Sequence, residues 1–321
     1  MQKIVQCVPN FSEGRDLEKV ERIVAPLKNQ EGFKLVSYEP DKDYNRTVVT
    51  LLGDPNAMIE PLLRFIDVAV KEIDMTNQKG EHPRMGAVDV LPFIPIAEVT
   101  MDDCVEIAHH IGKRIAEEIN VPVFTYAEAA QVPSRKKLPN IRKGEFEGMA
   151  EKIQEEKWHP DYGEAKIHPT AGVIGVGARL PLIAYNIDLD TEDIEIAKKI
   201  AKAIRGSSGG FKHVQAGPVY LDERKHVQVT MNILNYKQNP IYRVIETVKM
   251  EAKRYHIDVL SSEIVGLVPK DTVIRSLKYY YAVEGLKWND EMSISEIAIA
   301  AQKYLLFRDF DTEKIIEANL T

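Results

Sequence analysis

Residues 79–90, KGEHPRMGAVDV, combine a side chain suited to proton transfer with residues that shape the backbone around it. His82 is the natural proton carrier, because an imidazole with an ordinary pKa of about 6.5 can accept and donate a proton near neutral pH. Pro83 restricts His82 to extended conformations, and Gly80 and Gly86 allow a ligand to approach the main chain. The segment indicates a general acid–base site on a loop, with an ordinary solvated loop as the alternative.

Three arginine and asparagine side chains are candidates for polar contacts to a substrate. Arg84 follows His82 on the same loop and carries a planar donor fork that can bind a carboxylate. Asn45 and Arg46 stand where DKDYNRTVV, residues 41–49, enters an expected strand. For these two residues the pattern alone favours the tip of a hairpin over a substrate contact.

VPNFSEGR, residues 8–15, leads from an expected strand into an expected helix. Ser12, Gly14 and the backbone amides at that point could hold an anion at the helix N-terminus. Capping of the helix by Ser12 is the alternative explanation.

The glycine-rich segments do not fit a nucleotide site. GSSGGFKH, residues 206–213, follows an expected helix, so a helix stop explains its glycines. GVIGVGAR, residues 172–179, has the order GxxGxG rather than the GxGxxG of dinucleotide-binding proteins, and the chain has no GxxxxGK[ST] segment. We therefore expect no nucleotide cofactor.

The histidines outside the His82 loop do not suggest a metal site. His109 and His110 are adjacent on an expected helix, so their side chains point in different directions, one packed and one exposed. His159 and His168 border an irregular segment without an HExxH motif or a cysteine partner. We expect no metal, and we interpret the tyrosines at 279–281 as a packing surface.

The composition is that of an acidic globular protein. The 321 residues include 42 Lys and Arg against 49 Asp and Glu, a formal net charge of −7, and no long block of one sign. This balance argues against a disordered tail and against a binder of polyanions. No apolar stretch is long enough to span a bilayer, the first residues lack a signal-peptide core, and the two cysteines fit a reducing compartment. We expect a cytoplasmic protein of two domains.

Apolar periodicity predicts the same order of elements in both halves of the chain. In the first half, strands are expected at 3–8, 33–38, 46–52 and 88–96, with helices after the first and third, the second helix capped by Asp54 and begun by Pro55. In the second half, strands are expected at 181–189 and 257–267, and a hairpin at 217–234 turns near 222–225. Helical stripes lie at 197–204 and 241–252, the second preceded by a repeated cap at Asn239 and Pro240.

The predicted fold class is α+β, with two ferredoxin-like subdomains of βαββαβ order, each a split βαβ unit. In each subdomain two helices cover one face of a four-stranded antiparallel sheet, and the other face is free to meet a partner sheet. Residues 127–178 form an irregular joining loop that includes one short helix, FEGMAEKIQEE. We expect an N-terminal subdomain at 1–180 and a C-terminal subdomain at 181–321, which ends in two closing helices.

The order of several motifs resembles the formiminotransferase family, the transferase part of formiminotransferase-cyclodeaminase. These motifs are VPNFSEGR, NRTVVTLLG, GEHPRMGAVDVLPFIPI, EAAQVPSRKKLPNIRKGEFE, GAR, LIAYNIDL and SSEIVGLVP, between residue 3 and about residue 275. GEHPRMGA is the specific piece, and the others corroborate it. The resemblance implies transfer of the formimino group from N-formimino-L-glutamate to N5 of tetrahydrofolate in histidine breakdown.

The resemblance also implies roles for particular residues. His82 matches the catalytic histidine, and tetrahydrofolate is a co-substrate. Arg46, Arg84 and Arg179 are our candidates for binding glutamyl carboxylates. The implied folate-binding residues are Gly163, Glu164, Ala165, Lys166, Ile167, His168, Pro169, Thr170, Ala171 and Gly172. Thr170 and Ala171 stand where some relatives carry a bulkier aromatic residue, so this segment is not expected to stack on the pterin ring.

Two other functions stay open at this stage. One is transfer of a formyl group, from N-formylglutamate or in 5-formyltetrahydrofolate turnover, because the two groups differ by one heteroatom. The other is a non-catalytic module that senses folate or an amino acid. The family implies a homodimer, and the length leads us to expect the transferase alone, with any cyclodeaminase on a separate protein.

Overall fold

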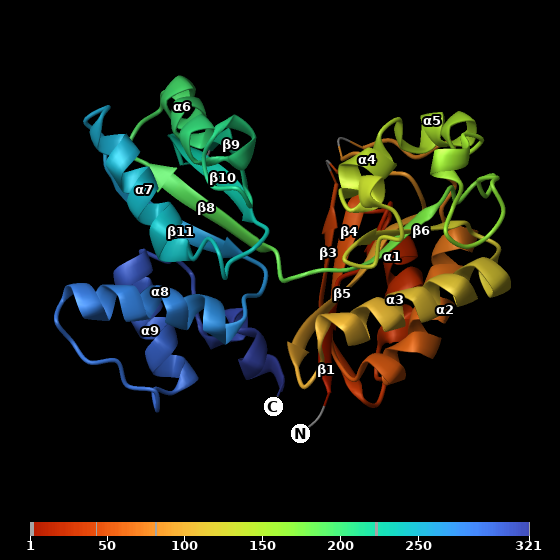
Figure 1. The fold of residues 1–321 in the computed structure, drawn as a ribbon, viewed down its shortest axis with the longest axis horizontal. Coiled ribbons are helices and arrows are strands. Elements are labelled where there is room, and N and C mark those ends of the chain that lie inside the picture. The colour runs from red at the N-terminus through yellow and green to blue at the C-terminus, as the bar shows by residue number, and fades with distance from the viewer. Residues whose placement is uncertain (1–2, 43, 81, 222–223, 321) are drawn as a thin grey trace. The chain divides into compact units, whose positions relative to one another are not determined.

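The computed structural model describes residues 3–42, 44–80, 82–221 and 224–320. The chain forms two compact units, Met1–Arg179 and Leu180–Thr321, and each unit has its own sheet with helices packed on it (Figure 1). The predicted α+β class is confirmed. Among the described residues, no helix is long and apolar enough to cross a membrane.

The sheet of the first unit begins as the predicted split βαβ arrangement. Two short strands in succession, β1 (Ile4–Cys7) and β2 (Asn10–Phe11), each pair with β4 (Arg46–Gly53) on one side and with β5 (Val88–Ala97) on the other. The strand β3 (Phe33–Asp41) pairs with the other edge of β4. All of these pairs are antiparallel. This part of the sheet is therefore consistent with the predicted split βαβ unit.

The same sheet then continues into two strands that the sequence analysis missed. β7 (Ile174–Ala178) pairs in parallel with β5, and β6 (Val123–Ala127) pairs in parallel with β7. The prediction of four antiparallel strands is thus wrong for this unit, and the joining loop is shorter than 127–178. Strands of parallel pairs are buried on both faces, so they lack the alternation that marks an antiparallel strand. Gly175 and Gly177 also weaken the strand pattern in the sequence. A Cβ atom at Gly175 would lie 2.8 Å from Met85 Cε, and one at Gly177 would lie 2.7 Å from the Tyr126 ring.

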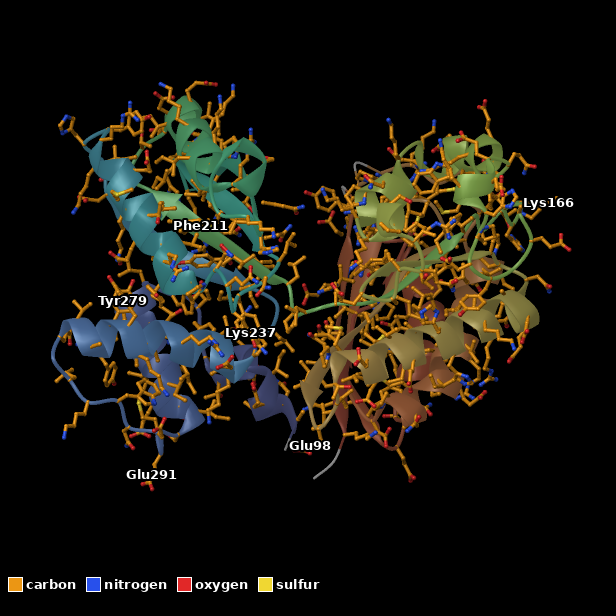
Figure 2. All side chains as sticks on the ribbon, in the orientation of Figure 1. Glu98, Lys166, Phe211, Lys237, Tyr279 and Glu291 are labelled. Atoms are coloured by element: carbon orange, nitrogen blue, oxygen red, sulfur yellow. The ribbon has the colours of Figure 1, made fainter. Side chains whose placement is uncertain are left out.

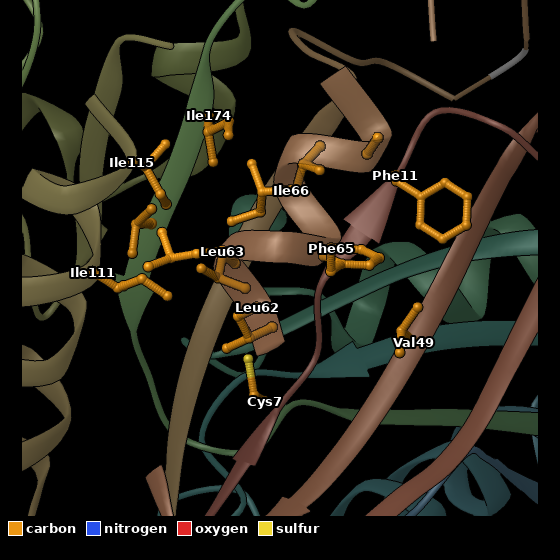
Figure 3. Packing of buried hydrophobic residues seen from close by; sticks show 14 of the residues in the cluster. Cys7, Phe11, Val49, Leu62, Leu63, Phe65, Ile66, Ile111, Ile115 and Ile174 are labelled. Atoms are coloured by element: carbon orange, nitrogen blue, oxygen red, sulfur yellow. The ribbon is translucent and has the colours of Figure 1, made fainter. Parts of the chain in front are cut away.

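Three helices cover one face of this sheet. They are α1 (Leu17–Val24), α2 (Pro55–Glu72) and α3 (Met101–Arg114). Asp54 caps α2 as predicted, since its carboxylate accepts a hydrogen bond from the Asn56 amide at 2.8 Å. Figure 3 shows the resulting core, in which Leu62 and Leu63 of α2 lie among Ile111 of α3, Ile115 just after it and Cys7 of β1. Burial of these apolar stripes fixes the helices against the sheet.

Two short helices of the joining region, α4 (Leu138–Arg142) and α5 (Glu145–Lys152), cover the opposite face at β6 and β7. Alternation along β6 points Val123 into the main core and Phe124 into a second, smaller core. The buried members of that second core are Met85, Phe124, Tyr126, Ile141, Met149, Ile153 and Val173. The joining region is therefore packed structure, and it brings α4 close to the segment that follows His82.

The second unit has the predicted topology. Its elements are β8 (Ile183–Leu189), α6 (Ile194–Ile204), β9 (Val214–Leu221), β10 (His226–Ile233), α7 (Ile241–Lys253) and β11 (Val259–Val265). The sheet order is β11-β8-β10-β9 with antiparallel pairs throughout, and α8 (Lys270–Val283) and α9 (Ile294–Leu305) pack against α7 (Figure 1). Part of the predicted hairpin turn, residues 222–223, lies outside the described residues.

Three local predictions in the second unit have different outcomes. The helix stop is confirmed, because α6 ends at Ile204 just before the glycine-rich segment. The cap at Asn239 is wrong, since Pro240 holds the N-cap position of α7, and the Tyr242 amide in the first turn donates to Ser276 Oγ of α8 at 3.2 Å. The tyrosines of α8 form a packing surface as predicted. Tyr279, labelled in Figure 2, stacks on Tyr242 of α7 with ring centroids 4.1 Å apart.

Candidate active site

The loop that carries His82 is joined to two other predicted segments through its backbone. Ser12 donates its hydroxyl to the Gly86 carbonyl and its amide to the Ala87 carbonyl, both at 2.8 Å. From the other side, the Ala87 amide donates to the Ala171 carbonyl at 2.9 Å, and Gly86 and Gly172 form a bridge. The structure thus brings together residues 8–15, 79–90 and the end of 163–172. Glu81 lies outside the described residues.

Ser12 is not the helix cap that the sequence suggested as one explanation. Asp16 caps α1, because its carboxylate accepts the Lys19 amide at 3.0 Å. The hydroxyl of Ser12 is committed to Gly86, 74 residues away, and sequence periodicity contains no signal for such a contact. Ser12 is therefore a residue that anchors the His82 loop.

The amides proposed as an anion site are already occupied by the protein's own carboxylate. Glu13 Oε1 accepts hydrogen bonds from the amides of Gly14, Arg15 and Asp16 at 3.0–3.1 Å. Burial by itself raises the Glu13 pKa, but these backbone bonds and the Lys19 ammonium 3.0 Å away outweigh it, and the net pKa is lowered. Glu13 therefore stays ionised and fills the position of an external anion.

His82 is half-buried, and its hydrogen bonds define which ring nitrogen is free. Nδ1 lies 2.7 Å from the Pro83 carbonyl oxygen, which can only accept, so Nδ1 carries the proton. Nε2 is then the nitrogen with the lone pair, and Nη1 of Arg46, which can only donate, contacts it. Arg46 Nη1 is also 2.7 Å from Nδ1, so this donor faces both ring nitrogens and does not distinguish them. The Pro83 carbonyl is the contact that favours the Nδ1–H tautomer.

The surroundings of His82 favour the neutral ring strongly. Burial, and next the positive charge of Arg46, lower its pKa to about 4; Arg142 adds to this effect, while the Pro83 bond and Asp89 oppose it. At neutral pH the imidazole is therefore uncharged. The exposed ring of Tyr44 packs edge-on against it, with centroids 5.7 Å apart.

Arg46 is held beside His82 by Asn10 of β2. The Nε and Nη2 groups of Arg46 donate to Asn10 Oδ1 at 3.0 and 2.6 Å. Burial lowers the pKa of Arg46, and within the described part of the chain Asp89 is the carboxylate whose charge acts on it. Asn10 was missed from the sequence, where it reads only as a polar residue after Pro9 at the break between β1 and β2.

Asn45, the neighbour of Arg46, holds the hairpin tip in place. It is buried and adopts the left-handed conformation, with a φ of 47°. Its side chain accepts from the Gly14 amide at 3.0 Å and donates to the Lys79 carbonyl at 2.9 Å. The contacts of Asn45 join the three loops around Arg46.

Arg84 is committed to partners within the protein. Its Nη1 and Nη2 atoms form salt bridges with Glu145 and Glu147 of α5 at 2.8 and 2.6 Å, and its Nε donates to Gln78 Oε1 at 2.8 Å. The residue is buried, so these contacts tie the His82 loop to α5. All three of its guanidinium nitrogens therefore have partners in this structure.

A second layer of charged residues lies behind His82. Asp89 is 1% exposed; its Oδ1 accepts the Met85 amide at 2.9 Å and its Oδ2 accepts Arg142 Nη2 at 2.6 Å. The Tyr126 phenol is buried, which raises its pKa in spite of a hydrogen bond from Arg179 at the end of β7. Asp89 and Arg142 were missed from the sequence because they lie 53 residues apart and meet only in the folded unit.

The predicted folate-binding segment is buried at its end, at Ala171 and Gly172, and exposed at Gly163, Glu164, Lys166 and Pro169. Ile167 packs against both cores, and the His168 ring accepts the Ala171 amide on Nδ1 at 3.0 Å. Gly163 adopts a φ of 92°, and Lys166 projects outward from the loop (Figure 2). Burial lowers the His168 pKa, so this ring is also neutral. A partly exposed segment fixed beside the His82 loop is placed where it could contact a ligand bound at His82.

The remaining histidines do not form a metal site. His109 is half-buried and bonds the Tyr162 hydroxyl through Nδ1 at 2.9 Å, whereas His110 is exposed, as predicted. Over the residues that the structure describes, no group of three or more His, Cys, Asp or Glu side chains could hold a metal ion.

Comparisons with known proteins cover both units. Residues 4–179 match the family model described as the formiminotransferase domain, N-terminal subdomain, and residues 184–321 match the formiminotransferase domain. A glutamate formimidoyltransferase of Streptococcus pyogenes serotype M1 is 47% identical over 91% of this chain and 98% of its own, and one of Thermoplasma acidophilum is 44% identical over 91% and 96%. A formimidoyltransferase-cyclodeaminase of Dictyostelium discoideum is 42% identical over 98% of this chain and 60% of its own.

Proposed function

This chain belongs to the formiminotransferase family, and we propose that the site around His82 carries out the transfer. The enzyme moves the formimino group of N-formimino-L-glutamate to N5 of tetrahydrofolate and releases L-glutamate. The observation that carries our assignment of the site is the half-buried His82 held between the Pro83 carbonyl and Arg46, surroundings that lower its pKa to about 4.

The chemistry requires one group that accepts a proton from one nitrogen and then donates a proton to another. N5 attacks the amidine carbon, and the tetrahedral centre then has two candidate leaving amines. The bond between the amidine carbon and N5 forms, and His82 Nε2 takes the proton from N5. His82 Nε2 then gives this proton to the glutamate nitrogen as the bond between the amidine carbon and that nitrogen breaks. A base that is already neutral at pH 7 can accept the first proton without a prior titration step.

Arg46 and Arg179 are the arginines that we propose for the glutamyl carboxylates. Arg46 contacts Nε2 of His82 in this structure, and a substrate carboxylate would draw the guanidinium toward itself and leave the lone pair available. For Arg84 we propose an anchoring role in place of the predicted substrate contact, because Glu145, Glu147 and Gln78 already hold it.

Tetrahydrofolate binding is assigned to residues 163–172. Support comes from the exposed residues of this segment and from its backbone contact with Gly86 and Ala87 on the His82 loop. We further propose that the enzyme acts in the cytoplasm as a homodimer, and that no metal or nucleotide takes part in the reaction.

A donor comparison tests the function. Purified protein is incubated with tetrahydrofolate and either N-formimino-L-glutamate or N-formyl-L-glutamate, and the folate product is measured by absorbance and mass. We expect transfer from the formimino donor to be faster by about a hundredfold or more. Transfer from the formyl donor alone would identify a formyltransferase, and binding of both substrates without turnover would identify a sensing module.

A further inference from the structure

Among the described residues behind His82, two guanidinium groups lie with one carboxylate. Arg46 and Arg142 are the two cations, and Asp89 is the carboxylate whose charge acts on Arg46 and which bonds Arg142. Since buried charges in proteins are normally paired, this excess points to an anionic ligand.

Arg142 is the least satisfied member of this cluster. It donates through Nη2 to Asp89, while its Nε is buried and has no hydrogen-bond partner in the part of the chain that the structure describes. Arg135 also has a buried, unpartnered Nε, but its other two nitrogens bond to Asp161 and to the carbonyls of Lys157 and His159. Arg135 is therefore a structural residue, whereas Arg142 retains donors for a ligand.

The position of Arg142 is fixed from both sides. It is the last residue of α4, whose C-terminal carbonyls at Asn140, Ile141 and Lys143 accept hydrogen bonds from the Lys152 ammonium at 2.6–3.0 Å. Asp89 holds the guanidinium with one oxygen and the Met85 amide with the other. Since Met85 belongs to the His82 loop, the Asp89 carboxylate fixes the position of Arg142 relative to that loop.

We propose that Arg142 is a specificity-determining residue of the transfer site, whose guanidinium binds the α-carboxylate of the glutamyl donor while Asp89 orients it. The inference rests on the proposed function, because it assigns a substrate group to a residue of that site. The α-carboxylate is the anionic group nearest to the transferred carbon, since it is attached to the carbon that bears the formimino nitrogen. The glutamyl carboxylates of the folate lie at the far end of that molecule, so a cation close to His82 suits the donor.

Arg142→Met tests this assignment on the enzyme side. We expect the KM for N-formimino-L-glutamate to rise about tenfold or more, with little change in kcat or in the KM for tetrahydrofolate, because a charge-assisted contact to the donor is lost. Lys143→Met removes the same charge from the adjacent, exposed residue and should leave all three constants unchanged. Because Arg142→Met also leaves the Asp89 carboxylate without its cation, the double variant Asp89→Asn/Arg142→Met repeats the measurement with neither charge.

A modified donor tests it on the substrate side. The α-carboxamide of N-formimino-L-glutamate lacks the charge that Arg142 is proposed to bind. Wild-type enzyme should lose about tenfold in kcat/KM with this donor, and Arg142→Met should discriminate little between amide and acid, because the two changes remove one interaction. Equal discrimination in wild type and variant, or an unchanged KM in a folded Arg142→Met protein, would overturn the assignment of Arg142. Absence of transfer by the wild-type enzyme would instead reject the proposed function.

Discussion

Replacing His82 with Asn lowers kcat for formimino transfer by about a hundred- to ten-thousandfold, while the fold and the affinity for tetrahydrofolate are unchanged. The magnitude is that of a lost general acid–base catalyst. Asn can still donate to the Pro83 carbonyl as Nδ1–H does in the native ring, but it offers no basic nitrogen to N5. Steady-state kinetics, circular dichroism and a folate-binding titration measure the three properties.

The matched control is His110→Asn, which changes an exposed histidine on α3. This variant should retain wild-type turnover. If His82→Asn bound folate normally and turned over near the wild-type rate, His82 would not be the proton carrier.

Gly86→Ala should be the most destabilising small substitution in the site. A Cβ at this position would lie 2.0 Å from the Val173 carbonyl oxygen and 2.9 Å from the Ala171 carbonyl oxygen. Both are backbone atoms in the contact between the His82 loop and the proposed folate segment, so they cannot turn away as a flexible side chain would. We expect the free energy of unfolding to fall by about 3 kcal/mol, from the cost of overpacking a tight contact.

Thermal unfolding followed by circular dichroism measures this loss. At about 2–4 °C per kcal/mol for a chain of this size, Tm should fall by roughly 6–12 °C. Gly148→Ala is the control, since a Cβ there meets nothing within 4 Å and the residue lies inside α5. It should keep or raise Tm, because Ala favours a helix over Gly by roughly 0.5–1 kcal/mol. Equal Tm values for Gly86→Ala and wild type would show that the contact at Gly86 is looser than described.

The elements that sequence periodicity predicted correctly are those that bury a single face. The stripe from Met58 to Ile66 in α2 and the Asp54 cap are local signals, readable within a few residues. β6 and β7 were missed because their residues are buried on both faces and because glycines at 175 and 177 make room for Met85 and Tyr126. Such strands are recognised only when their neighbours in the sheet are known.

The candidate site divides in the same way. His82 stood out from the sequence because its chemistry and the flanking Pro83 and Gly86 are contiguous. Its partner Arg46 lies 36 residues from Asn10, which holds Arg46 in place. Arg84 meets Glu145 and Glu147 only after α5 packs on the sheet. Long-range contacts of this kind determine which arginines bond to other residues of the protein and which keep donor groups for a ligand. The spacing of residues in the sequence does not reveal them.

The protonation state of His82 is the central element of this account. Its lowered pKa has two main causes, burial and the charge of Arg46, and they can be separated. Arg46→Gln removes the charge and leaves the burial, so the pKa should move upward from about 4 toward the ordinary value of about 6.5.

The most direct measurement is a titration of the His82 ring by nuclear magnetic resonance in protein labelled with ¹⁵N-histidine, with His82→Asn used to assign its signal among the eight histidines. We expect a neutral Nδ1–H tautomer at pH 7 and a ring that is only about one-tenth protonated at pH 5, as a pKa of about 4 requires. A ring that titrates near pH 6.5, or that carries its proton on Nε2 at neutral pH, would contradict this expectation.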